Sequence, residues 1–234
     1  MAHFLRQIAV FALFTCWAGV WAQQATAPKW GKIEPAQFGP DLAGRFPDAA
    51  AVVLHDYGEL SFGMGTEGYL VILDRHVRIR ILTEAGGSLA VQSIPYISGL
   101  PGENEVVRRV RAQTLYEQGG KVIAVPVPGS DIRTEQAEPG WMEIRISFPE
   151  IKPGAILEYT YRMVSPNYYR PPEWPFQREI PTLISEVKMR PNKLLDYAIL
   201  LRGGSGEQLE LRSEHHWRME NTPPIREEPF TTTL

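Results

Sequence analysis

The sequence predicts an all-β protein, an antiparallel β-sandwich of roughly ten strands. Apolar and polar residues alternate with a period of two through most of the chain. Twenty glycines and twenty prolines among 234 residues interrupt these runs at short intervals, as turns between short strands do. No apolar stripe with the helical period of 3.6 residues continues beyond two turns in the sequence.

The first 22 residues are predicted to be a secretory signal. Arg6 gives a weakly basic start, an uncharged apolar run extends from Ile8 to Trp21, and Val20 and Ala22 place small residues at a cleavage site. The apolar run is shorter than the ~20 residues that a membrane-spanning helix needs, although an uncleaved anchor is the alternative. We therefore expect export to the periplasm or cell envelope, with membrane contact only before cleavage.

Composition excludes several classes of site. The formal net charge of −3 gives no bulk attraction to nucleic acid. The single cysteine, Cys16, lies inside the predicted signal, so the exported chain would have no thiol nucleophile, disulfide or thiolate metal site. The 44% hydrophobic content is that of a globular domain, which must then be held together by core burial alone.

The chain before the sandwich differs from the rest. Residues 23–48 show little periodicity and are predicted to form an extended lead-in, with a short helical turn beginning near residues 38–41. The sandwich itself is expected to occupy residues 49–220. Its first strand is expected at residues 51–56, and glycine-rich residues 63–68 are expected to form a turn.

The clearest strand is expected at residues 71–81. Its odd positions are apolar, so we expect them to be buried. We expect the even face to be solvated, with the side chains of Asp74, His76, Arg78 and Arg80. Arg75 breaks the apolar face, which indicates a bulge there or the end of the buried part.

The same alternation continues downstream. It predicts strands at residues 106–116, 121–125, 141–148, 157–163, 183–190, 195–201 and 209–217. Gly119 and Gly120 indicate a tight hairpin, since both residues can adopt positive φ. The polar, proline-rich residues 221–234 are predicted to be a linker toward a downstream domain.

No pattern of catalytic or metal-binding residues emerges. His55, His76, His215 and His216 have no metal-ligand spacing, and adjacent histidines on a strand point to opposite faces. A carboxylate pair for acid–base chemistry remains conceivable among Glu158, Glu173, Glu179 and Glu186, but such residues on strands are usually solvated. We therefore expect no catalytic residue, no metal and no cofactor.

The most distinctive segment is residues 165–181. It combines several prolines with four aromatic side chains, Tyr168, Tyr169, Trp174 and Phe176. Prolines stiffen a segment, and aromatic rings with polar edges offer stacking area. The four residues are candidates for a surface that binds a glycan, a peptide or a neighbouring domain. The alternative is a structural crossover whose aromatic side chains plug one end of the sandwich.

Several segments together resemble a known family. They are residues 50–59 (AAVVLHDYGE), 75–82 (RHVRIRIL), 93–96 (SIPY), 148–159 (FPEIKPGAILEY), 174–177 (WPFQ) and 180–181 (IP). In this order and spacing they resemble the domain of unknown function found N-terminal to transglutaminase-like domains in exported bacterial proteins. The resemblance covers about residues 45–230. It implies a β-sandwich without known activity of its own, followed in relatives by a Cys-His-Asp domain.

These observations lead to one main hypothesis. The chain is expected to be a non-catalytic accessory domain that packs against a transglutaminase-like domain in the same polypeptide or operon. The alternative is a glycan- or peptide-binding module that uses the aromatic, proline-rich segment. No residue here matches the catalytic cysteine of such a partner domain, and no nucleic-acid partner is expected.

Overall fold

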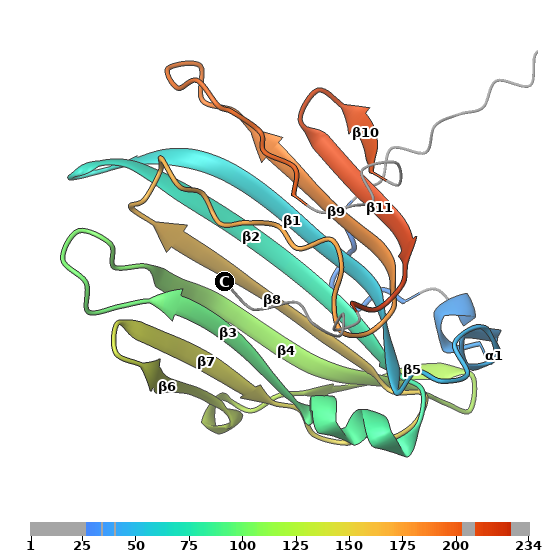
Figure 1. Ribbon diagram of the computed structural model, residues 1–234. Coiled ribbons are helices and arrows are strands. Elements are labelled where there is room, and N and C mark those ends of the chain that lie inside the picture. The colour runs from blue at the N-terminus through green and yellow to red at the C-terminus, as the bar shows by residue number, and fades with distance from the viewer. Residues whose placement is uncertain (1–26, 34, 40, 203–208, 226–234) are drawn as a thin grey trace, which may run out of the picture.

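The computed structural model describes residues 27–33, 35–39, 41–202 and 209–225. The predicted signal and most of the predicted linker lie outside these residues. The described chain is mostly β, with one eight-stranded and one three-stranded sheet (Figure 1). The predicted all-β, sandwich-like class is confirmed. No helix among the described residues has both the length and the apolar character needed to cross a bilayer.

The large sheet is built from strands along the whole chain. Its strands are β1 (Ala51–Gly65), β2 (Gly68–Ile81), β4 (Val106–Gln118), β5 (Lys121–Pro126), β8 (Ile156–Ser165), β9 (Thr182–Arg190), β10 (Glu210–Ser213) and β11 (His216–Thr222). Their spatial order is β10-β11-β9-β1-β2-β8-β4-β5. The long β1–β2 hairpin therefore lies in the middle of the sheet (Figure 1).

The small sheet and the short helices complete the described fold. The small sheet contains β3 (Val91–Ile97), β6 (Ile132–Glu138) and β7 (Trp141–Ser147), in the order β3-β7-β6. The helices are η1 (Pro35–Phe38), α1 (Asp41–Arg45), η2 (Glu84–Ala90) and η3 (Gly129–Asp131). Helix α1 agrees with the short helical turn expected before the sandwich.

One strand pair departs from the antiparallel expectation. β1 and β9 pair in parallel, whereas all other strand pairs in the described residues are antiparallel. Since β8 also runs parallel to β1, the chain must travel back along the sheet between β8 and β9. Residues 166–181, which we call the crossover, make this connection (Figure 1). The aromatic, proline-rich segment is thus the connection that the parallel pair requires.

The first face of the large sheet carries the main apolar core. Odd positions of β2 such as Val77 and Ile79 are buried there, as predicted, beside Leu157 of β8. The small sheet contributes Ile94 and Ile146 to the same cluster. Two sheets therefore pack face to face around this core, which is the sandwich arrangement.

Part of the second face is covered by the N-terminal segment instead of water. A second apolar cluster joins Val52 and Leu54 of β1 to Phe38, Leu42 and Phe46. Beside this cluster, the even positions of β2 are also buried, namely His76, Arg78 and Arg80. The expectation that this face is solvated is therefore wrong for these three residues, because Pro28, Lys29 and residues 37–39 pack over them.

Three local predictions are wrong. Arg75 makes no bulge in β2, because its side chain pairs with buried Asp56 and the inward face continues. Residues 195–201 form no strand, and residues 209–217 form a hairpin in place of one strand. Alternation along a chain is necessary for such strands, but a strand also needs a neighbouring strand to pair with.

Candidate functional site

A fully buried carboxylate ties the N-terminal segment to the second face. Glu158 accepts hydrogen bonds from His76 Nε2 at 2.8 Å, Arg78 Nε at 2.9 Å and Gln113 Nε2 at 2.6 Å. It also accepts one from the backbone N–H of Gly31 at 2.9 Å. Burial alone would raise the pKa of Glu158, but these hydrogen bonds and the Arg78 charge outweigh it and lower the pKa.

Two arginines of β2 bind the main chain of the same segment. Arg80 donates to the carbonyl oxygens of Gln37, Phe38 and Gly39 at 2.6–2.8 Å. Arg78 donates to the carbonyl oxygen of Lys29 at 2.6 Å. Carbonyl groups at the end of a helix have no hydrogen-bond donor within the helix. The planar guanidinium has several N–H donors in a fixed fork, so one arginine side chain can satisfy several of these carbonyls.

A second buried carboxylate lies farther along this face. Glu186 of β9 contacts His55 at 2.8 Å, His216 at 3.1 Å and Arg218 at 3.4 Å. Burial would raise its pKa, but the hydrogen bonds and charges of these neighbours lower the pKa to about 2. Burial in turn lowers the pKa of His216. The expectation that strand carboxylates are solvated is wrong for Glu158 and Glu186.

A third buried charge cluster fixes the crossover on the first face. Asp56 accepts hydrogen bonds from Arg75 at 2.8 and 2.6 Å and from Arg178 Nε at 3.0 Å, and it also contacts Arg178 Nη2. The guanidinium of Arg75 lies 4.5 Å from the ring centre of Trp174, whose Nε1 donates to Ser185 Oγ at 3.1 Å. Trp174 and Arg178 both belong to the crossover, so it is held by specific contacts.

The structure separates the four aromatic candidates. Trp174 is partly buried against the core, and Phe176 is also partly buried. Tyr168 packs against Tyr169 and against Tyr69, with ring centres 5.5 Å apart in both cases. Tyr169 is 75% exposed. Tyr168 and Tyr169 therefore form one group, whereas Trp174 anchors the crossover.

An exposed apolar surface surrounds the end of the β1–β2 hairpin. Tyr69 pairs with Met64, which is 67% exposed, and Phe62 lies two residues before Met64 on the same face. The ring of Phe62 packs 4.7 Å from that of Tyr197. The residues beside Tyr197 include several exposed apolar side chains. We call the following set the hairpin-end surface: Met64, Tyr69, Tyr168, Tyr169, Leu194, Tyr197, Ile199, Leu200 and Leu201.

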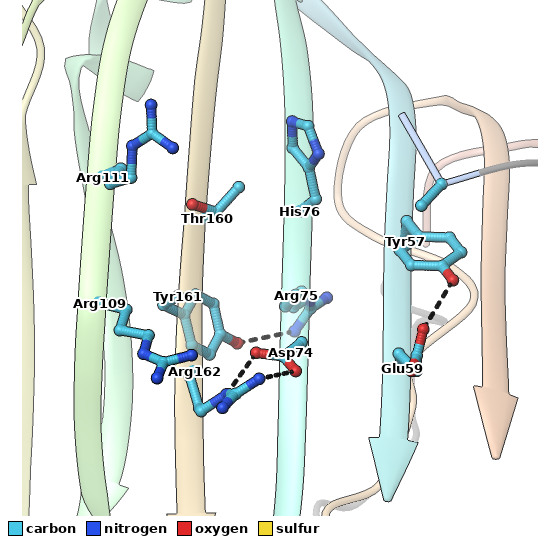
Figure 2. Close-up of a pocket in the computed structure, with 11 residues that line it drawn as sticks. Tyr57, Glu59, Asp74, Arg75, His76, Arg109, Arg111, Thr160, Tyr161 and Arg162 are labelled. Carbon is cyan, nitrogen blue, oxygen red and sulfur yellow. Dashed lines mark hydrogen bonds and ion pairs between the residues drawn. The ribbon is translucent and has the colours of Figure 1, made fainter. Parts of the chain in front are cut away.

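A groove crosses the second face. One cavity of about 310 Å³ lies over β1, β2, β8 and β4 (Figure 2). A second of about 480 Å³ lies over β1, β9 and the β10–β11 turn. Tyr57 and Glu59 line both, so the two hollows are adjacent. Four arginines line the first cavity, namely Arg75, Arg109, Arg111 and Arg162 (Figure 2).

The carboxylates of the groove are already paired. Asp74 accepts two hydrogen bonds from Arg162 at 2.7 and 2.6 Å (Figure 2), and Glu59 contacts Arg190 at 2.5 Å. Among the described residues, no group of three or more His, Cys, Asp or Glu side chains is arranged to hold a metal ion. Sequence reasoning missed this groove, because its residues come from seven strands and no local motif connects them.

Comparison with known proteins places the fold. The chain is similar to a crystal structure of a putative protease from Parabacteroides distasonis, with a TM-score of 0.58 and 14% identity. The match covers 79% of this chain and 38% of that one, so the chain spans well under half of that protein. Native yeast LTA4 hydrolase matches with a TM-score of 0.32 and 12% identity, over 75% of this chain and 27% of that one.

The sequence comparison gives the family. A family model described as a domain of unknown function with a solved structure (DUF3857) matches residues 70–226. The chain belongs to this family. A comparison with curated proteins finds no match.

Proposed function

We propose that the chain is a non-catalytic accessory domain of an exported bacterial protein, and that it packs against a transglutaminase-like domain in the same polypeptide or operon. The hairpin-end surface carries this proposal. Met64 is 67% exposed, Leu200 is 74% exposed and Leu194 is 76% exposed. The ring contact between Phe62 and Tyr197 brings the loop that carries Leu194 and Leu200 to the hairpin. Exposed apolar side chains gathered in one region are typical of surfaces that another protein covers.

Two further observations support an accessory role. The Parabacteroides protein is longer than the region that matches, so the same fold occurs there within a larger protein described as a putative protease. In addition, Asp56, Glu158 and Glu186 are each held by at least one arginine and by two or more hydrogen bonds inside the domain. Carboxylates held in this way stabilise the fold and are poorly placed to exchange protons with a substrate.

The test is complex formation with the partner domain. We expect the chain and the transglutaminase-like domain from the same polypeptide or operon to form a stoichiometric complex in gel filtration and calorimetry. Leu200→Asp should weaken it at least about tenfold, because a charge at an apolar contact must be desolvated. The matched control is Val122→Asp on the edge strand β5, an exposed apolar residue outside the hairpin-end surface.

Two results would contradict the docking proposal. One is the absence of any complex between the two domains. The other is an equal loss of affinity in Leu200→Asp and Val122→Asp, which would show that the hairpin-end surface is not the docking site. Export is tested separately by N-terminal sequencing of the protein from the cell envelope, with Gln23 as the expected first residue.

A glycan- or peptide-binding role is a second candidate, favoured by the exposed ring of Tyr169. Tyr168 and Tyr169 offer an aromatic platform. Trp174 adds little to it, since its indole is held against the sheet by Ser185 and Arg75. Binding of a glycan by the isolated chain that is lost in Tyr169→Ala would favour this role over docking.

A further inference from the structure

A β-bulge in β4 directs an arginine toward the first cavity. Arg108 pairs with Arg162 of β8, and Arg111 pairs with Thr160, so Arg109 and Val110 together oppose the single residue Tyr161. Val110 packs toward the core, whereas Arg109 lines the cavity. Bulges re-aim side chains in this way and are frequent beside functional sites.

The backbone of Arg109 is strained. Its φ is 56°, in the left-handed region that an L side chain enters at a cost of about 1–2 kcal/mol. Glycine would avoid this cost at the same position. Strain at a residue that lines a cavity points toward a role for its side chain, since the fold alone does not need an arginine there.

The positive charge of the cavity is incompletely neutralised. Arg162 is paired with Asp74, while Arg111 lies 4.4 Å from the ring centre of Trp30. Neither Arg109 nor Arg111 has a carboxylate partner among the described residues. Figure 2 shows Arg109 extending from β4 toward β8, where Arg162 stands. Two guanidinium groups thus lack an anion while a third is fixed nearby.

The surroundings are suited to an anionic group. Arg162 is held by two parallel hydrogen bonds and Arg111 by an aromatic face, so both are positioned before any ligand arrives. Tyr57 and Thr160 add neutral hydroxyl groups to the lining. A volume of about 310 Å³ matches the lower end of small-molecule sites.

We propose that this cavity binds the oxyanion group of a small ligand, a carboxylate or a phosphate, through Arg109 and Arg111. The guanidinium fork matches both groups, because each offers two oxygen acceptors in one plane. The site lies on the second face of the large sheet, whereas the hairpin-end surface lies on the first. The proposal is therefore independent of the docking proposal.

Calorimetry with two probes tests the site. Inorganic phosphate and citrate are titrated separately into the purified chain at low ionic strength, and at least one is expected to bind with saturation. Arg109→Ala and Arg111→Ala should each weaken binding about tenfold, because hydrogen bonds between charged groups are lost. Raising the salt concentration should weaken it further. Thermal unfolding checks that both variants remain folded.

The matched control is Arg133→Ala on β6. Arg133 is an exposed arginine of the small sheet and does not line the cavity. Binding of phosphate alone would assign a phosphate-bearing ligand, and binding of citrate alone a carboxylate-bearing one. The proposal is overturned if neither probe binds, or if Arg133→Ala weakens binding as much as Arg109→Ala does.

Discussion

The indole ring of Trp174 occupies the space that a side chain at position 58 would need. A Cβ atom placed on Gly58 would lie 2.3 Å from Cζ3 and 2.7 Å from Cη2 of that ring. Glycine is needed here because of this close approach and not because of a left-handed backbone. The contact joins β1 to the crossover, so it helps to determine how the chain returns to form the parallel β9 strand.

Gly58→Ala is expected to destabilise the protein by about 1–3 kcal/mol, because the added methyl group must displace a packed ring. Urea unfolding followed by tryptophan fluorescence measures the effect. Gly129→Ala is the control, since a Cβ at Gly129 would meet open space. Equal stabilities of the two variants would contradict the assigned packing.

Glu158→Gln is expected to destabilise the protein by about 3–5 kcal/mol, since it leaves buried Arg78 without its counter-charge. The change should also loosen residues 27–33, because Gly31, His76 and Arg78 are held through this carboxylate. Tryptic cleavage after Lys29 and Lys32 should then become faster than in the wild type. Glu173→Gln, at an exposed position, should change neither stability nor cleavage.

Stability should fall in acid as Glu186 becomes protonated. Its pKa is about 2 in the folded state against an ordinary value of 4.5, so its stabilisation is complete above pH 4.5 and is lost as the pH falls through 2. The difference corresponds to roughly 3 kcal/mol. Glu186→Gln should be less stable near pH 7 and should lose less stability between pH 4.5 and 2. Parallel acid profiles of variant and wild type, measured by denaturant unfolding, would contradict this assignment.

The period-two pattern predicted the fold class and most strands of the sandwich. The pattern could not predict which face of the large sheet is covered by other parts of the chain, because the segments that pack on a face are distant from it in the sequence. Arg78 and Arg80 read as solvated charges, yet they lie beneath residues without periodicity that bind them through backbone carbonyls. Only the large aromatic residues of the lead-in, Trp30, Phe38 and Phe46, indicate that this segment packs on another part of the protein.

The candidate site was predictable only in part. The crossover was recognised from its prolines and aromatics, and the alternative of a structural crossover was already contained in that pattern. Its aromatic residues do not form one surface, because the Trp174 ring packs against Gly58 whereas the Tyr168 ring packs against Tyr69. The arginine-lined cavity was not predictable, since its arginines come from three strands and the bulge that turns Arg109 has no glycine to mark it.

Arg109→Gly is expected to change the stability of the protein and its affinity for an oxyanion in opposite directions. Glycine adopts the left-handed backbone without the cost that arginine incurs, so the variant is expected to be more stable by up to about 1 kcal/mol. The same change removes the guanidinium and should weaken oxyanion binding about tenfold. Urea unfolding and calorimetry on one preparation measure both effects. A gain in stability without a loss of binding would show that the strained arginine does not contact the ligand. A loss of stability would show instead that the Arg109 side chain supports the sheet, which would remove the strain argument for a binding role.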